Sequence, residues 1–334
     1  MFKKLFLLLF ILLLSSCASI IKREYKINLP VVIAGEKVFG VEIQPEVSLC
    51  NRDRVIELNP EWIRTSINWA EVEETKGTYT WNTNFSTDLE FLNTINTKVI
   101  VVIKMTPIWA RTDSRSCSRI REENIPDFVN FIRQVLIKYP TIKYIEIWNE
   151  QDVEIGVDDY YGCWGDHTEL YYGGGYYATI INSVYTTLKP LYLDVQFIYG
   201  GLANPIGNYL EGSLIAGAKF DILSFHYYSW FSNQDKTIKD EVQFLRDVLK
   251  KYNKEVPIIL TETSLLCAEG ATYCDQDFLI AQANYVDKIE QEVREERLIG
   301  WIWYALPATG WNNSGLLFND GIPKPAYYRL KGGE

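Results

Sequence analysis

The sequence predicts an α/β fold, a (β/α)8 or TIM barrel. Two patterns support this prediction: eight short apolar runs typical of parallel strands buried on both faces, and amphipathic segments of helical period between them. The expected strands span residues 38–43, 62–67, 98–104, 143–148, 195–199, 221–226, 257–261 and 298–303. Eight strands that alternate with helices over roughly 300 residues are typical of a closed barrel.

The clearest helices are expected at residues 127–139, 176–188, 239–252 and 276–294. An open, doubly wound sheet is the alternative arrangement of the same elements. No glycine-rich phosphate loop follows any of the expected strands, which counts against that alternative. In a barrel, functional side chains lie where the strands end at their carboxyl-terminal mouth.

The composition is that of a folded protein and excludes several partners. Of the 334 residues, 47% are hydrophobic and 23% are charged, which does not fit a disordered chain. The formal net charge of −10 makes nucleic acid an unexpected partner, because binding to phosphates requires a basic surface. The chain has 47 aromatic residues (10 Trp, 22 Tyr and 15 Phe) but only 2 His, so a catalytic metal is not expected.

The N-terminus has the pattern of an export signal. Lys3 and Lys4 precede the apolar run 5–14, which is too short to cross about 30 Å of hydrocarbon. Residues 14–17 resemble the bacterial lipobox, which implies that Cys17 is lipidated, although it could be an incidental residue of a secreted protein. We expect a signal peptide (1–16), a tether (17–29) and one barrel domain (30–334), anchored at the bacterial cell envelope through lipid alone.

Five further cysteines follow, and export favours disulfide bonds between them. Cys267 with Cys274 is the first expected pair and Cys117 with Cys163 the second, which leaves Cys50 over. The spacing does not fix this connectivity. No CxxC pair is present, so a zinc cluster is not expected.

Acidic residues end two of the expected strands. Alternation of side chains places Glu146, Trp148 and Glu150 on one face of the fourth strand, with Glu150 at the mouth, and Glu262 ends the seventh. Paired carboxylates suit the cleavage of a glycosidic bond, because one acid protonates the leaving oxygen while the other attacks the anomeric carbon or activates water. A single acid at a strand end could instead be a helix cap or part of a structural ion pair.

These strand ends resemble the signature motifs of the clan A retaining glycoside hydrolases. The matching motifs are Ile-Trp-Asn-Glu at 147–150, Phe-His-Tyr-Tyr at 225–228 and Leu-Thr-Glu at 260–262. Further similarity, to enzymes of the family 39 and family 5 type, lies at residues 62–69, 77–81, 106–110 and 315–327, so the resemblance covers nearly the whole mature chain. The chain departs at Gln151, where these enzymes often have proline.

The resemblance implies a role for each matched residue. It makes Glu150 the general acid/base and Glu262 the nucleophile of a double displacement that retains the anomeric configuration. It also implies that Asn149 bonds to the substrate 2-hydroxyl and that Tyr228 donates to Glu262.

Three further positions have two interpretations each. The resemblance places Arg64 beneath the nucleophile, but it could equally pair with Glu146 inside the barrel. His226 could contact the substrate or be a satisfied inward side chain, and Trp303 would form the floor under the sugar.

Aromatic residues after the strand ends, Trp109 among them, could stack on sugar rings or simply pack the loops onto the barrel. The others are Tyr160, Tyr161, Trp164, Tyr171, Tyr172, Trp230 and Trp311.

The sequence therefore predicts a retaining glycoside hydrolase that acts on O-glycosidic, β-linked bonds of an oligo- or polysaccharide without a cofactor. One alternative is a carbohydrate-binding lipoprotein that uses the same scaffold without catalysis. Another is an esterase that pairs Ser224 or Ser264 with His226, although no GxSxG elbow is present.

Overall fold

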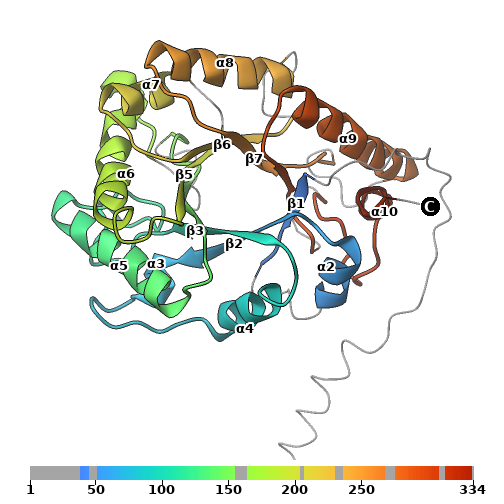
Figure 1. The fold of residues 1–334 in the computed structure, drawn as a ribbon, viewed down its shortest axis with the longest axis horizontal. Helices are drawn as coiled ribbons and strands as arrows, with labels where there is room; N and C mark the ends of the chain where they lie inside the picture. The colour runs from blue at the N-terminus through green and yellow to red at the C-terminus, as the bar shows by residue number, and fades with distance from the viewer. Residues whose placement is uncertain are drawn as a thin grey trace, which may run out of the picture.

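The strands form a closed, all-parallel barrel. The computed structural model describes residues 38–44, 51–154, 164–203, 207–229, 236–267, 275–307 and 313–332. Each strand pairs with its neighbours in chain order, and β1 pairs with β8 to close the sheet. Helices surround the strands on the outside (Figure 1). The predicted (β/α)8 barrel is confirmed.

All eight expected strands are present, with bounds within three residues of the prediction. They are β1 (Phe39–Glu42), β2 (Trp62–Asn68), β3 (Lys98–Lys104), β4 (Tyr144–Asn149), β5 (Gln196–Leu202), β6 (Ile222–Tyr227), β7 (Ile258–Thr263) and β8 (Trp301–Trp303). β8 starts later than expected because the backbone N–H of Leu298 still bonds to the carbonyl of Val293 and closes the preceding helix.

At least one described helix follows every strand. They are α2 (Arg52–Leu58), α3 (Trp69–Val72), α4 (Thr83–Leu92), α5 (Ile125–Lys138), α6 (Gly174–Leu188), α7 (Gly207–Ile215), α8 (Ile238–Lys251), α9 (Gln276–Glu295) and α10 (Pro325–Lys331), with short 3-10 turns η2 (Glu122–Asn124) and η3 (Leu170–Gly173). Side-chain caps fix several helix starts: Asn82 accepts from the N–H of Phe85, Asp275 accepts from Phe278, and Thr237 opens a capping box.

The barrel interior has an apolar layer near the amino ends of the strands. This layer is formed by Trp62, Ile100, Ile198, Ile222, Ile259 and Ile302. Gly40 faces the same space, where an added Cβ would lie only 2.6 Å from the Cβ of Trp62. Since Trp62 fills this end of the barrel, charged groups further along the strands are sealed off from solvent below.

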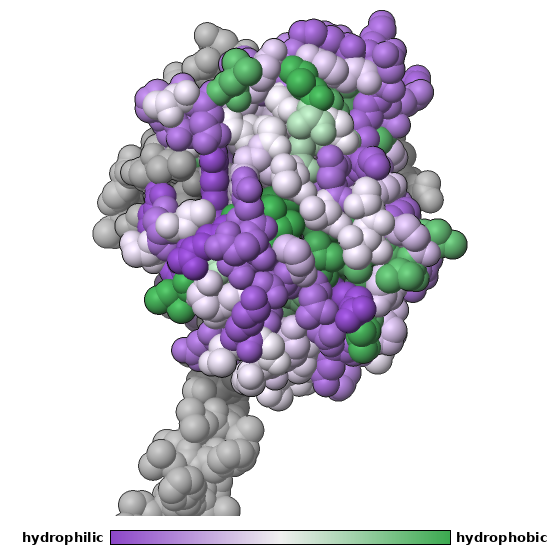
Figure 2. All heavy atoms as spheres, turned by 90° about the vertical axis from the view of Figure 1, so that its left-hand side faces the viewer, coloured by the Kyte–Doolittle hydropathy of each residue, from purple (hydrophilic) through white to green (hydrophobic). Residues whose placement is uncertain are grey.

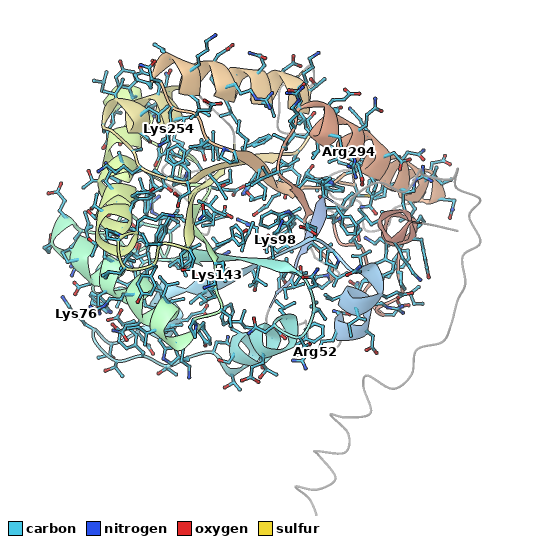
Figure 3. All side chains as sticks on the ribbon, in the orientation of Figure 1. Arg52, Lys76, Lys98, Lys143, Lys254 and Arg294 are labelled. Atoms are coloured by element: carbon cyan, nitrogen blue, oxygen red, sulfur yellow. The ribbon has the colours of Figure 1, made fainter. Side chains whose placement is uncertain are left out.

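The described surface is mixed in polarity (Figure 2), and several of its basic side chains pair with acids. Figure 2 shows the side on which α5, α6 and α7 lie, where hydrophilic residues dominate and hydrophobic residues form small separate groups. The basic side chains labelled in Figure 3 are dispersed, and most pair with a nearby acid, as Lys98 does with Glu61 at 2.7 Å and Lys143 does with Asp194. None of the described helices is both long and apolar enough to span a membrane.

Several predictions concern residues that the structure does not describe. The signal peptide, Cys17 and the tether lie outside the described residues, as do Tyr160, Tyr161, Trp230 and Trp311. Cys117 and Cys267 are each disulfide-bonded. Their predicted partners, Cys163 and Cys274, also lie outside the described residues, so the pairing stays a prediction, as does the unpaired state of Cys50.

Ile302→Ala tests the apolar layer. Ile302 is fully buried inside the barrel, so its truncation should lower the free energy of unfolding by about 2–5 kcal/mol. Urea unfolding monitored by circular dichroism measures this change. Leu193→Ala is the control, because Leu193 is 77% exposed and its loss should change stability by less than about 0.5 kcal/mol. Equal effects of the two substitutions would contradict the packing role of Ile302.

Candidate active site

Arg64, on β2, is the centre of the polar half of the barrel and is only 2% exposed. Its Nε and Nη2 donate to the two carboxylate oxygens of Glu146 at 3.0 and 3.2 Å. Its Nη1 donates to Glu42 at 2.5 Å and also to Glu262, and Nη2 donates to Asn149 Oδ1 at 2.5 Å. All five N–H donors of the guanidinium are thereby used, on side chains from β1, β4 and β7.

The two interpretations of Arg64 are therefore compatible, because it contacts both Glu146 and Glu262. Glu146 is completely buried, and its Oε1 also accepts from the backbone N–H of Gly201 at 2.8 Å. This carboxylate has no path to a substrate, so its role is to hold Arg64.

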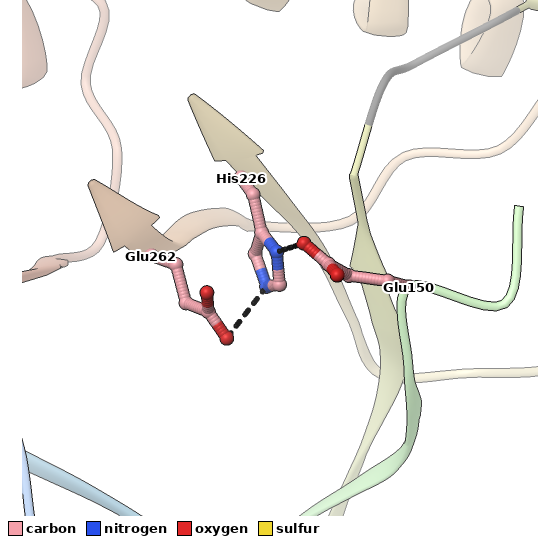
Figure 4. A group of neighbouring side chains, drawn as sticks. All are labelled: Glu150, His226 and Glu262. Atoms are coloured by element: carbon pink, nitrogen blue, oxygen red, sulfur yellow. Dashed lines mark hydrogen bonds and ion pairs between the residues drawn. The ribbon is translucent and has the colours of Figure 1, made fainter. Parts of the chain in front are cut away.

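Three side chains meet at the mouth above Arg64. Figure 4 shows His226 between Glu150 and Glu262. His226 Nδ1 lies 2.9 Å from Glu150 Oε1, and its Nε2 lies 3.6 Å from Glu262 Oε1. One carboxylate oxygen of Glu150, one of Glu262 and one imidazole nitrogen all lie within 4.8 Å of one another. The two strand-end acids thus share a single site.

Glu262 is held from both sides. The hydroxyl of Tyr228 donates to Glu262 Oε2 at 3.0 Å, while Arg64 bonds to Oε1. The contact expected between Tyr228 and Glu262 is therefore present, and both oxygens of the carboxylate have a donor.

The backbone at the end of β4 departs from simple alternation. Trp148 has φ +76° and Glu150 has φ +51°, both in the left-handed region that non-glycine residues seldom adopt. Trp148 consequently packs outward, edge-on to Phe128 of α5, while Asn149 faces Arg64. The prediction that Trp148 shares a face with Glu146 and Glu150 is wrong, because the backbone turns between Glu146 and Glu150.

A second irregularity places Glu262. Phe225 pairs with Leu260, but the next residue, His226, pairs with Glu262, so Thr261 is the extra residue of a bulge in β7. Ile259 points into the barrel, and strict alternation from it would turn Glu262 outward. The bulge restores the inward direction and brings Glu262 level with His226.

Burial and charge act in opposite directions on these groups. Burial by itself disfavours the charged form of Glu262, but the positive charges of His226 and Arg64 outweigh it and lower its pKa. For Glu42 burial is dominant and, with the negative charge of Glu262, raises its pKa to about 7. Burial acts to lower the pKa of His226, yet Glu262 and Glu150 together raise it. The site therefore favours an ionised Glu262.

The same three residues could in principle ligate a cation, since a carboxylate pair and an imidazole converge there. Arg64 already bonds to Glu262, however, and the charge of Lys104 also acts on that carboxylate. A divalent ion would be repelled by both of these charges. The residue set fits a cation poorly, and the expected absence of a metal stays a prediction.

Trp303 does not line the site. It is completely buried, its indole N–H donates to the carbonyl of Ser314 at 2.8 Å, and its ring packs against Tyr285 of α9. Because its neighbour Ile302 points into the barrel, Trp303 points outward to the helices. The prediction that Trp303 forms the floor under a sugar is wrong.

Two loop tryptophans serve packing. Trp164 is fully buried and donates to the carbonyl of Cys117, so it cannot stack on a sugar. Trp109 is half-buried, donates to the carbonyl of Glu73 and contacts Trp69 edge-on. Trp109 thus ties the loop after β3 to the loop after β2, and its substrate contact stays a prediction.

Sequence reasoning missed Glu42, Lys104 and Gly201. Glu42 ends β1 and Lys104 ends β3, so the strand-end criterion that identified Glu150 and Glu262 would also have found them. Gly201 had no such signal. An added Cβ there would lie 2.2 Å from His226 Nε2, so the absence of a side chain is what leaves room for the imidazole.

Comparisons with known proteins support the same architecture. No family model matches the sequence, and no curated protein is significantly similar to it. Among solved structures, a family 39 glycoside hydrolase from the gut symbiont Bacteroides cellulosilyticus WH2 superposes with a TM-score of 0.69 at 21% identity, over 88% of this chain and 62% of that chain. This chain thus spans less than two thirds of that protein.

Two xylanases are also similar. The catalytic domain of the GH30 xylanase C from Talaromyces cellulolyticus gives a TM-score of 0.64 at 14% identity, over 90% of this chain and 76% of that chain. Xylanase XynB from Paenibacillus barcinonensis, complexed with a conduramine derivative, gives a TM-score of 0.63 at 15% identity, over 89% of this chain and 96% of that chain. These matches establish the fold.

Arg64→Met tests the buried network. Removal of the guanidinium leaves buried carboxylates without a counter-charge, which should cost about 3–5 kcal/mol of stability near neutral pH. Without Arg64, burial raises the pKa of Glu262, so the folded variant binds protons that the unfolded chain releases above about pH 5. The variant should therefore become less stable relative to the wild type as the pH rises from 5 to 8.

Chemical denaturation at pH 5 and pH 8 measures this difference. The control is Arg294→Met, because Arg294 pairs with Glu290 on the exposed surface of α9 and should contribute less than about 1 kcal/mol. A pH-independent loss in the Arg64 variant would mean that the guanidinium acts through packing and not through charge.

Proposed function

We propose that this protein is a retaining glycoside hydrolase with Glu262 as nucleophile and Glu150 as general acid/base. The observation that carries the proposal is the pair of carboxylates from β4 and β7 that converge within 4.8 Å across His226. Retaining enzymes need a separation of about 5–5.5 Å, so that the nucleophile reaches the anomeric carbon directly, whereas inverting enzymes need about 6.5–9.5 Å to admit water. The short approach favours retention.

In the first step, a carboxylate oxygen of Glu262 attacks the anomeric carbon and the bond to the leaving oxygen breaks. Glu150 gives its proton to that oxygen. In the second step, Glu150 accepts a proton from water, which attacks the anomeric carbon and releases Glu262 as a carboxylate.

The surroundings of the two acids suit these different roles. Arg64 and Tyr228 donate to the two oxygens of Glu262, which favours its ionised form. Glu150 has 17% of its side chain exposed, compared with 9% for Glu262, so it can exchange protons with incoming water. Asn149 precedes Glu150 and bonds to the same guanidinium as Glu262, and it is proposed to bond to the substrate 2-hydroxyl.

The esterase alternative has less support. Ser224 donates to the carbonyl of Tyr199 at 2.5 Å, and Ser264 Oγ is buried without a partner. Among the described residues, neither serine bonds to His226. The Nδ1 of His226 is instead within hydrogen-bond distance of Glu150. A nucleophilic serine requires such a base.

The substrate is proposed to be a β-linked oligo- or polysaccharide. Two of the similar solved structures are described as xylanases, which makes xylans the first polysaccharides to test. A binding protein without catalysis would not need a buried Glu262 with a donor on each carboxylate oxygen, so the non-catalytic alternative ranks second.

The activity assay compares the wild type with Glu262→Gln and Glu150→Gln on xylans, other β-glycans and aryl β-glycosides. Loss of the nucleophile should lower kcat by several orders of magnitude on every substrate. Loss of the acid should cost much less on an aryl glycoside whose leaving group needs no proton. Glu61→Gln is the matched control, since Glu61 pairs with Lys98 at the opposite end of the barrel.

Product analysis by NMR should find the anomeric configuration retained. Glycan binding without turnover by the wild type would favour the non-catalytic alternative, and equal turnover by wild type and Glu262→Gln would show that the site is elsewhere.

We further propose that a lipid attached to Cys17 anchors the mature protein to the cell envelope. Carbohydrate would then be its substrate, and the lipid anchor its only attachment to the membrane. The support is the basic, then apolar, then small-residue order of residues 3–17. Expression in a bacterial host fed a labelled fatty acid should label the wild type, and Cys17→Ser should abolish the label. Cys50→Ser is the control, and unlabelled wild type would favour simple secretion.

A further inference from the structure

Glu42 is a buried acid that the proposed mechanism does not use. It ends β1 and is only 8% exposed, as deeply placed as Glu262 at 7%. Its Oε2 accepts from Nη1 of Arg64 at 2.5 Å, and the same nitrogen donates to Oε1 of Glu262. The two carboxylate oxygens on one nitrogen lie at most about 5 Å apart. Any change of charge on one acid is therefore felt by the other.

The charges around Glu42 are too few to keep every acid ionised. Arg64 of β2 and Lys104 of β3 are the cations that act on it, and Glu262 of β7 is the anion. Arg64 also bonds to Glu146 of β4, and the charge of His226 of β6 acts on Glu262. Tyr228, beyond β6, contributes only a neutral hydroxyl. On the β8 side, the strand residues Trp301–Trp303 carry no titratable group, but Tyr304 follows them directly and, like Glu42, acts on Tyr228. One proton shared within this group relieves the repulsion.

Of the two acids on this nitrogen, Glu42 is the one expected to take the proton. Burial, and then the charge of Glu262, raise the pKa of Glu42 to about 7, whereas the pKa of Glu262 is lowered. With the proton on Glu42, the ionised carboxylate of Glu262 keeps its bond to Arg64. Near neutral pH the protonated and ionised forms of Glu42 are similar in free energy, so a small change in its surroundings decides its charge.

The proposed reaction makes such a change. When a carboxylate oxygen of Glu262 bonds to the anomeric carbon, the carboxylate becomes a neutral ester, and Arg64 loses the negative charge that Glu262 provided. The leaving oxygen takes its proton from Glu150, which lies on the far side of His226 and does not contact Arg64.

We propose that Glu42 is a charge-compensating positioning residue: it releases a proton to solvent when Glu262 becomes an ester and regains one when Glu262 is freed. This inference rests on the proposed function. The charge that Glu262 loses is replaced by one on Glu42, so the guanidinium stays in place and its positive charge toward the developing oxocarbenium ion remains compensated. With 10% of its side chain exposed, Glu42 can pass the proton to the mouth.

The test follows the titration of Glu42 without requiring turnover. The full chain is labelled with 13C at the glutamate carboxyls, and the Glu42 signal is assigned by its loss in Glu42→Gln. In the wild type, the Glu42 signal should titrate near pH 7. In Glu262→Gln, which imitates the neutral ester, its midpoint should fall by about one unit or more. Glu61→Gln is the control and should leave the midpoint unchanged.

A second measurement uses the native protein in case a variant fails to fold. Glycosyl fluorides are suitable substrates because the fluoride that they release takes no proton at pH 7. Protons that appear while the glycosyl-enzyme intermediate accumulates therefore come from the protein. Calorimetry in buffers of different ionisation enthalpy should find about half a proton more from the wild type than from Glu42→Gln, because an acid of pKa near 7 is half-protonated there. Any contribution of Glu150 is common to both proteins.

The outcomes separate the two proposals. An unchanged Glu42 midpoint in Glu262→Gln, or a wild-type midpoint in the ordinary range of glutamate, overturns the role of Glu42 whether or not hydrolysis is found. A shifted midpoint in a protein that hydrolyses no glycoside overturns the proposed function, and with it the catalytic part of this inference, while the electrostatic coupling stands.

Discussion

Arg64 donates all five of its N–H groups inside the barrel, and the carboxylates and the amide that it holds come from three other strands. Such a buried network contributes little net stability, because the desolvation of each charge opposes the attraction between them. What it provides is position. Glu42, Asn149 and Glu262 each accept a hydrogen bond from Arg64, and this bond fixes the orientation of each side chain. The mouth of the barrel is therefore ordered before any ligand enters.

The apolar half of the barrel shields this charged network from solvent on one side. Trp62 and the isoleucines around it fill the amino-terminal end, and Gly300 leaves the room that the indole needs, since an added Cβ there would lie 2.4 Å from Trp62 Nε1. Water therefore reaches the charged layer only from the mouth, where Glu42, Glu150 and Glu262 have small exposed fractions. Electrostatic interactions are stronger in such surroundings than in water, which accounts for the opposite shifts in the pKa values of Glu42 and Glu262.

The two central acids owe their directions to irregular backbone. Left-handed residues at the end of β4 turn Trp148 outward and bring Asn149 and Glu150 into the site, and the bulge at Thr261 does the same for Glu262. Irregular strands of this kind cost energy and persist where the surrounding packing over-determines them. Here that packing includes the tilted ring contact between Trp148 and Trp164 and the bonds of Glu262 to Arg64 and Tyr228.

The sequence alone determined the barrel, its eight strands and the two strand-end acids, because burial on both faces leaves a continuous apolar run and the carboxyl ends of parallel strands must meet. The tertiary structure decided which way the side chains face. Trp303 faces outward, Trp148 breaks alternation, and Gly201 leaves space for His226, since each depends on neighbours distant in the chain. Only the tertiary structure shows that Glu42, Glu146 and Glu262 share Arg64. This contact requires strands separated by up to about two hundred residues to close into one barrel.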